Sequence, residues 1–136
     1  DISNKKFIIN VEQNSNSFPI RKSIELVYGF RNFIGNANKF ANSKIFITIK
    51  SDSELSEIII EDDGKGYPKD IISKIGEPYL KESKSTDKSK RGLGLGIFIG
   101  KTLLEKNSAQ LICRNSQTRG GAEVKIVWKN NDLKML

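Results

Sequence analysis

Three polar residues in the first third of the chain have types and spacings that could do chemistry together. Asn32, Asn36 and Lys39 follow one another at intervals of four and three residues, which places them on one stripe of an α-helix. Amide oxygens are possible Mg²⁺ ligands, and a lysine ammonium can bind a phosphate as a point charge. The alternative is a solvent-facing polar stripe on an ordinary amphipathic helix, and these residues alone do not decide between the two.

A second stripe of the same segment is apolar and predicts a helix with one face in a core. Ser23 is a plausible N-cap for a helix from Ile24 to Ala41. Apolar residues recur along it at spacings of four and three, which is the helical period; they are Leu26, Phe30, Phe33, Ala37 and Phe40.

Two glycine-rich motifs follow further along the chain. The first, Asp-Asp-Gly-Lys-Gly at 62–66, places a carboxylate at a strand end, where burial requires hydrogen-bond donors. The second, Gly-Leu-Gly-Leu-Gly at 92–96, opens a predicted helix, and free backbone N–H groups at a helix start form an anion site. Taken alone, the first motif could be a simple turn and the second a flexible hinge.

In this order the three features resemble the ATP-binding domain of sensor histidine kinases, in which they are called the N, G1 and G2 boxes. The superfamily also contains type II topoisomerase subunits, Hsp90 chaperones and MutL mismatch-repair proteins. Gly-Glu-Pro-Tyr at 76–79 looks like the F box, and the resemblance runs from about Ile24 to Trp128. With Gly-Glu-Pro-Tyr, the runs at 26–29 and 98–105 look closest to the RegB-type redox-responsive sensor kinases.

The resemblance implies a role for each matching residue. Asn36 would hold Mg²⁺, and Lys39 would reach a phosphate of ATP. Asp62 would accept a hydrogen bond from the exocyclic amine of adenine, while Gly64 and Gly66 let the backbone pass close to the base. Two further residues hold positions of the apolar walls of the base pocket, namely Phe40 and Tyr67.

Asn32 is the residue that discriminates between activities. Water-splitting relatives carry a Glu as general base at this position, four residues before the metal Asn. An amide cannot accept a proton at neutral pH, so Asn32 favours transfer of the γ-phosphoryl group to a protein over hydrolysis. The alternatives are an ATPase or conformational clamp of the same superfamily, and a nucleotide-binding module without catalysis.

A basic, serine-containing loop at 81–91 looks like the ATP lid of the family. Lys84, Lys88, Lys90 and Arg91 are candidates for phosphate contact, although each could equally belong to a solvated charge run. Lys90 stands where the family usually has another glycine. The second glycine motif would contact the triphosphate through Gly92, Leu93, Gly94 and Leu95.

Composition bounds the partners. The chain has 136 residues, a net charge of +7, one cysteine and no histidine. The phosphoacceptor must therefore lie elsewhere, and the family places it on a His-bearing dimerisation domain of the same parent kinase, with a response regulator downstream. Zinc and helix-turn-helix patterns are lacking, so nucleic acid is not expected, and Cys113 reads as a small hydrophobe. No apolar run could span a bilayer, so we expect no direct membrane insertion by this domain. The resemblance implies a cytoplasmic domain whose parent can lie in the bacterial inner membrane.

The pattern of elements predicts one α+β domain over residues 1–136, with frayed ends at 1–6 and 129–136. The fold expected is a two-layer α/β sandwich, the Bergerat ATP-binding fold, with a mixed, mostly antiparallel sheet and helices on one face. The predicted strands are 7–11, 45–50, 55–61, 109–114 and 122–128, and the predicted helices are 24–41, 68–75 and 93–106.

Overall fold

The computed structural model describes residues 4–12, 23–72, 74–75 and 93–136. Five strands form one sheet in the order β1-β2-β3-β5-β4. Their bounds are Lys6–Val11 (β1), Lys44–Ser51 (β2), Leu55–Asp62 (β3), Gln110–Asn115 (β4) and Ala122–Lys129 (β5). The helices are Ile24–Phe40 (α1), Lys69–Ile72 (α2), Leu93–Lys106 (α3) and Asn130–Leu133 (α4).

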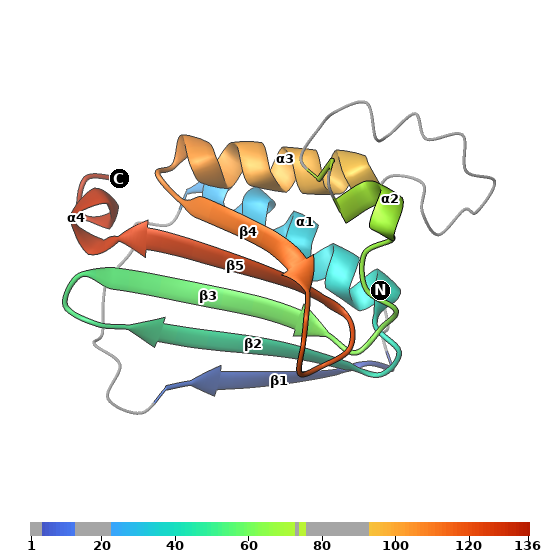
Figure 1. The fold of residues 1–136 in the computed structure, drawn as a ribbon. Coiled ribbons are helices and arrows are strands. Elements are labelled where there is room, and N and C mark those ends of the chain that lie inside the picture. Colours follow the sequence, from blue (N-terminus) through green and yellow to red (C-terminus); the bar gives the residue numbers. More distant parts are fainter. Residues whose placement is uncertain (1–3, 13–22, 73, 76–92) are drawn as a thin grey trace.

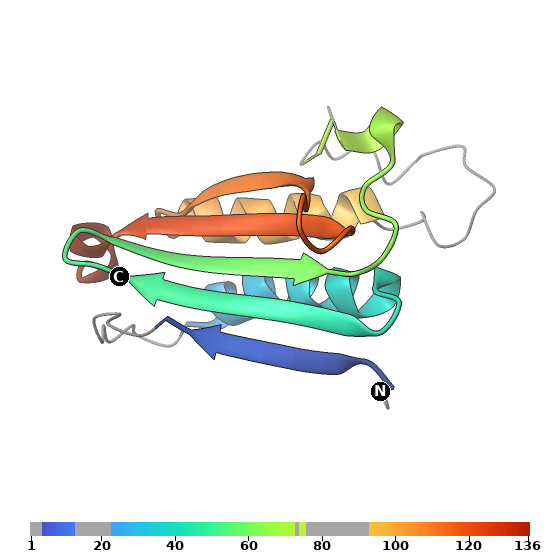
Figure 2. The same cartoon turned by 60° about the horizontal axis from the view of Figure 1, so that its bottom comes forward.

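The sheet is mixed, and the two long helices lie on one of its faces. β1 pairs with β2 in parallel, whereas the β2–β3, β3–β5 and β4–β5 pairs are antiparallel. Figures 1 and 2 show α1 and α3 side by side behind the sheet, with the other face open. The predicted two-layer α+β sandwich is confirmed.

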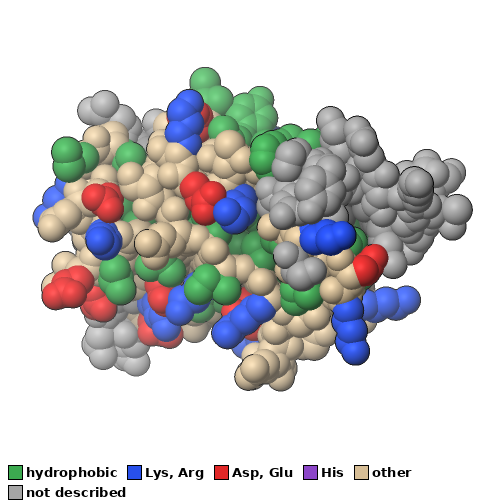
Figure 3. Space-filling model, turned by 45° about the horizontal axis from the view of Figure 1, so that its top comes forward, with side chains coloured by type: hydrophobic (Ala, Val, Ile, Leu, Met, Phe, Trp, Pro, Cys, Tyr) green, Lys and Arg blue, Asp and Glu red, His purple; other side chains and the backbone are tan. Residues whose placement is uncertain are grey.

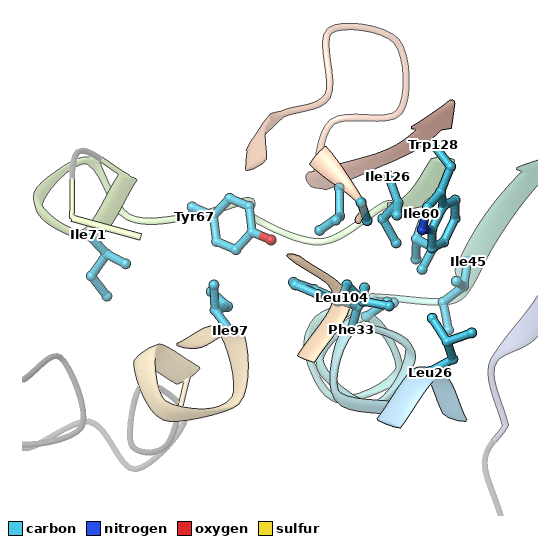
Figure 4. Close-up of a cluster of buried hydrophobic side chains, with 14 of the residues drawn as sticks. Leu26, Phe33, Ile45, Ile60, Tyr67, Ile71, Ile97, Leu104, Ile126 and Trp128 are labelled. Carbon is cyan, nitrogen blue, oxygen red and sulfur yellow. The ribbon is translucent and has the colours of Figure 1, made fainter. Parts of the chain in front are cut away.

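The hydrophobic core fills the space between the sheet and the helices. Figure 4 shows Phe33 of α1 and Leu104 of α3 directed toward Ile60 and Ile126 of the sheet. The most deeply buried side chains come from every layer of the sandwich, as expected when alternate strand residues and one helix stripe share a core; they are Phe33, Ile45, Ile97, Leu104, Ile126 and Trp128.

α1 and α3 pack closely because glycines stand at their contact. A Cβ on Gly29 would lie 2.8 Å from Cγ of Leu104, and one on Gly100 would lie 2.7 Å from Cε2 of Phe33. Side chains at these positions would force the helices apart. Ser23 caps α1 as predicted, since its hydroxyl accepts a hydrogen bond from the Leu26 N–H.

Both ends that the sequence predicts as frayed contain some regular structure among the described residues. Lys6 already belongs to β1, and the C-terminal residues form the short helix α4. Leu133 is 2% exposed, and Asn130 bonds to Ser56 and to the backbone of Asp52. The polar composition of this segment hid these anchors, because one leucine and one asparagine carry them.

The other boundaries differ from the predictions by one or two residues at most, apart from α2. That helix covers Lys69–Ile72 of the predicted 68–75. Among the described residues, none of the helices is both long enough and apolar enough to cross a membrane.

Candidate nucleotide-binding site

The predicted site residues come together at one end of the sandwich, where β3 ends and β5 begins. The antiparallel register pairs Glu61 with Glu123, so Asp62, one residue further, lies beside Ala122. α1 ends at the same side of the molecule (Figure 1). The β2–β3 and β3–β5 pairings thus bring Asp62 to the edge of the core under the C-terminal half of α1.

Asp62 is a buried carboxylate with one oxygen left for a ligand. The residue is 3% exposed, and its Oδ1 accepts hydrogen bonds from the N–H groups of Gly64 (2.9 Å) and Ala122 (3.3 Å). Within the described ranges, Oδ2 accepts none. Burial raises the pKa of Asp62, although the two backbone donors act in the opposite direction. A ligand N–H group could supply the donor that Oδ2 lacks.

Two glycines hold the backbone tightly around this carboxylate. A Cβ on Gly64 would lie 2.1 Å from the carbonyl oxygen of Phe40, and a Cβ on Gly121 would lie 2.0 Å from Oδ1 of Asp62. Neither position can carry a side chain without displacing backbone or the carboxylate. Gly64 was expected from the motif, whereas no motif singled out Gly121; its adjacency to Gly120 was the available signal.

Tyr67 forms an apolar boundary next to Asp62. Its ring is buried and lies near Ile71 and Ile97 in Figure 4. Burial raises the pKa of Tyr67 well above its ordinary value, with smaller contributions from Cys113 and Asp62. Burial likewise raises the pKa of the Cys113 thiol to about 11. Cys113 is therefore a neutral, half-buried side chain at pH 7, as the sequence predicts.

Asn32 and Asn36 face α3 rather than open solvent. A Cβ on Gly96 would lie 3.4 Å from both amide atoms of Asn36 and 3.7 Å from Oδ1 of Asn32. Asn32 donates from Nδ2 to the carbonyl of Tyr28 (2.8 Å), which leaves its oxygen on the side of α3. These two asparagines thus line the contact between the two long helices.

The Asn36 side chain has an unfilled polar atom in this buried position. Its Nδ2 is inaccessible to solvent and bonds to no other group that the structure describes. A buried amide without a partner is costly, so this residue fits a ligand that completes it. The two ends of an amide have the same shape, and turning the side chain would present its oxygen to a cation.

Lys39 and Phe40 connect this helix to the Asp62 loop. The Lys39 ammonium lies 5.3 Å from the centre of the Phe40 ring on an exposed surface. The Phe40 ring packs against the core, and its carbonyl meets Gly64 as described above. Asn36 and Asp62 are therefore at the same end of the molecule, as the resemblance requires.

Several predicted contacts fall outside the described residues. These are the Gly-Glu-Pro-Tyr run at 76–79, the loop at 81–91 with its four candidate basic residues, and Gly92. Leu93, Gly94 and Leu95 form the first turn of α3, so the helix begins where the second glycine motif predicts. The described residues contain no group of three or more His, Cys, Asp or Glu side chains that could hold a metal ion.

Several exposed lysines lie around this end of the molecule. Figure 3 shows Lys and Arg side chains spread over the visible face, with Asp and Glu side chains among them. The exposed lysines of α1, β2 and the segment after β3 are Lys39, Lys44, Lys65 and Lys69. A net positive field attracts a polyanion, so the charge distribution favours a phosphorylated ligand.

Comparison with known proteins identifies the family. A sequence profile described as "Histidine kinase-, DNA gyrase B-, and HSP90-like ATPase" matches residues 21–132, and the chain belongs to this family. It is 37% identical over 119 residues to the sensor histidine kinase RegB of Cereibacter sphaeroides, which covers 76% of this chain and 26% of RegB. It is 28% identical over 97 residues to the sensor protein RstB of Escherichia coli, covering 71% of this chain and 22% of RstB.

Solved structures support the fold. The catalytic domain of histidine kinase ThkA superposes with a TM-score of 0.73 at 18% identity, covering 95% of this chain and 82% of that one. A mycobacterial sensor histidine kinase, MprB, gives 0.69 at 21% identity, covering 93% and 82%. The chain thus spans about a quarter of the length of the curated RegB that it matches, and the predicted likeness to RegB-type kinases is confirmed.

Proposed function

We propose that residues 1–136 form a single domain, the catalytic and ATP-binding domain of a two-component sensor histidine kinase. The domain would transfer the γ-phosphoryl group of ATP to a histidine on a separate dimerisation domain of the same parent protein. The family match and the RegB likeness support the class. The chain contains no histidine, so the acceptor has to be supplied from outside it, and a response regulator would receive the phosphoryl group next.

The observation that carries this proposal is the unfilled oxygen of Asp62. A buried carboxylate with one oxygen bonded to backbone N–H groups and the other without a described donor is suited to read an exocyclic amine. Adenine offers that amine, and guanine offers a carbonyl oxygen at the same ring position. Gly64 and Gly66 would let the base approach the backbone, with Tyr67 and Phe40 as its apolar walls.

The phosphate side would use the contact between α1 and α3. Asn36 would hold Mg²⁺ through its amide oxygen, which turning the side chain would bring to the position now held by the unpartnered Nδ2. When bound, Mg²⁺ neutralises negative charge on the phosphate oxygens. Lys39 and the N-terminal turn of α3, with Leu93, Gly94 and Leu95, would add positive potential. We assign phosphate contacts also to Lys90, Arg91 and Gly92.

Asn32 would orient groups in the site without acting as a base. Its amide nitrogen is occupied by the Tyr28 carbonyl, and an amide does not take up a proton at neutral pH. Water bound next to the phosphates would therefore not be activated by this residue. This supports phosphoryl transfer, which mainly requires positioning and charge stabilisation, and it disfavours hydrolysis. The domain would work in the cytoplasm, where ATP is available.

The test is a transfer assay with γ-labelled ATP and the dimerisation domain of the parent protein. We expect acid-labile phosphate on that domain, transfer reduced about a hundredfold or more in Asn36→Ala, and almost no phosphate release when the acceptor is left out. Sustained phosphate release without the acceptor, at a rate equal to the transfer rate, would show an ATPase instead.

A further inference from the structure

The last residue of β4, Asn115, makes a two-point contact with the loop that follows Asp62. Its Oδ1 accepts a hydrogen bond from the Tyr67 N–H (2.6 Å), and its Nδ2 donates to the Tyr67 carbonyl (3.2 Å). A side-chain amide has an acceptor and a donor in one plane, so it can pair with the backbone N–H and C=O of a single residue. The two residues are 48 positions apart in sequence, so this contact fixes tertiary geometry and not a local turn.

The loop also lies close to Asn115 at Gly66. This glycine has φ +80°, a left-handed conformation that favours glycine, and a Cβ here would lie 2.6 Å from Oδ1 of Asn115. At the other end of the loop, Gly64 donates to Asp62 and contacts Phe40. The segment 64–67 is therefore held at both ends.

The β4–β5 residue pair that contains Asn115 also contacts Asp62. Asn115 pairs directly with Ala122, and the Ala122 N–H donates to Oδ1 of Asp62. In the turn that follows this pair, the Ser116 N–H donates a hydrogen bond to the Gly121 carbonyl (2.6 Å). The Ser116 hydroxyl donates to the Glu61 carboxylate (2.7 Å). One rigid end of the β4–β5 hairpin thus sets the distance between Asp62 and Tyr67.

We infer that Asn115 is a positioning residue of the base-binding site, acting through the Tyr67 backbone and not by touching the base. The inference rests on the proposed function, because it takes Asp62 and Tyr67 as the two sides that meet adenine. A loop already held in its bound shape loses less freedom on binding. Without Asn115 the part of the site around Asp62 and Tyr67 should bind adenine more weakly. The part that would bind the phosphates, built on α1 and α3, should be unaffected.

The experiment titrates three ligands into the chain by calorimetry: adenosine, Mg·ATP and Mg·tripolyphosphate. The variants are Asn115→Ala and the nearly isosteric Asn115→Asp, which keeps the acceptor but loses the donor. The matched control is Asn130→Ala, because Asn130 also makes two side-chain hydrogen bonds, to Ser56 and Asp52, at the opposite end of the sheet. Thermal melts of all variants measure the general loss of stability.

In both Asn115 variants we expect the affinities for adenosine and for Mg·ATP to fall together, about fivefold to twentyfold for one or two lost hydrogen bonds. The affinity for tripolyphosphate should change less than twofold. Asn130→Ala should lower the melting temperature and leave all three affinities within twofold. If Asn115→Ala does not fold, Asn115→Asp decides by the same criteria.

Two results would overturn the inference. One is adenosine affinity within twofold of wild type in a folded Asn115 variant. The other is an equal loss for tripolyphosphate, or the same loss in Asn130→Ala, since either would show general loosening. A wild-type chain that binds neither adenosine nor Mg·ATP would instead contradict the proposed function, so the two failures are distinguishable.

Discussion

Asp62 and Asp63 are adjacent, yet they belong to two regions with opposite electrostatics. Asp62 faces the helices at the end of β3, and burial raises its pKa. Asp63 lies at the turn between α1 and β2, where its Oδ1 accepts from the N–H groups of Asn42 (2.9 Å), Ser43 (3.0 Å) and Lys44 (3.1 Å), and Oδ2 from the Ser43 hydroxyl. Desolvation opposes the charged form of Asp63, but these donors outweigh it and lower its pKa to about 2.

The difference separates a carboxylate whose two oxygens are both hydrogen-bonded by the protein from one that keeps an oxygen without a described donor. Both Asp63 oxygens are used by the protein, so its charge is already stabilised and it has little capacity left for a ligand. Asp62 has an unused oxygen in a desolvated place, which is unfavourable for folding and favourable for recognition. Alternation along the strand points the two side chains to opposite faces, and the hydrogen bonds show how their environments differ.

The largest effect is expected for Gly64→Ala, which disrupts the loop that surrounds Asp62. The added Cβ would meet the Phe40 carbonyl at 2.1 Å, so the loop has to move and Asp62 loses a donor. We expect a loss of about 1–3 kcal/mol in the free energy of unfolding and loss of ATP binding, measured by denaturant titration and calorimetry.

The glycine control for that change is Gly35→Ala. A Cβ at Gly35 has nothing within 4 Å, and the residue lies inside α1, where alanine is favoured. This variant should gain about 0.5–1 kcal/mol. Equal stability of the two alanine variants would contradict the close packing at Gly64.

Asp63→Asn tests the other region, the turn between α1 and β2 whose N–H groups donate to Asp63. The variant loses a charged acceptor of several hydrogen bonds, and we expect about 1 kcal/mol of destabilisation, reduced by the solvent that reaches this turn. Its affinity for Mg·ATP should stay within twofold of wild type. A large loss of affinity in the folded variant would show that the two aspartates do not have separate roles.

The pH dependence of stability sharpens the comparison, because the two pKa shifts have opposite signs. Asp63 has a lowered pKa, so its stabilisation is present above the unfolded value near 3.9 and is lost as pH falls toward 2. Asp62 has a raised pKa, so its contribution is greatest below the unfolded value and is lost as pH rises through the folded value.

Thermal melts from pH 7 to pH 2 measure these contributions. Asp63→Asn should lose less stability than wild type between pH 4 and pH 2. Asp62→Asn should be no less stable than wild type at pH 7, since it buries an amide in place of a charge. The assigned environments would be refuted if Asp63→Asn lost as much stability as wild type between pH 4 and pH 2, or if Asp62→Asn were less stable than wild type at pH 7.

The smallest expected effect lies far from both aspartates. Ser108, at the end of α3, has φ 72°, a conformation that costs less for glycine. Ser108→Gly should stabilise the fold by about 0.5–1 kcal/mol and leave the affinity for Mg·ATP unchanged. A change in affinity would mean that this end of the sandwich is coupled to the site, against the local character described above.

Much of the fold was predictable because local patterns and tertiary packing agree. The apolar stripe of α1, the alternation in β2 and β5, and the cap at Ser23 each point to the observed element. α4 was not predictable from local patterns, because its anchors Asn130 and Leu133 depend on contacts with the distant β2–β3 turn and the core.

The motifs of the candidate site could be predicted from the sequence, but the residues that hold these motifs in position could not. Asn36 and Asp62 stand out by residue type and order. Asn115 and Gly121 matter through contacts that only the sheet register creates, since Asn115 meets Tyr67 and Gly121 meets Asp62. A single asparagine at a strand end and a glycine in a turn carry no such information in one sequence.

The central claim is that Asp62 reads adenine while its neighbour supports the fold, and the direct test is calorimetry of Mg·ATP with Asp62→Asn and Asp63→Asn side by side. We predict that Asp62→Asn, folded and as stable as wild type at pH 7, binds ATP at least tenfold more weakly, as loss of a hydrogen bond to a charged group implies. Asp63→Asn should bind within twofold of wild type. Wild-type affinity in Asp62→Asn would contradict the account.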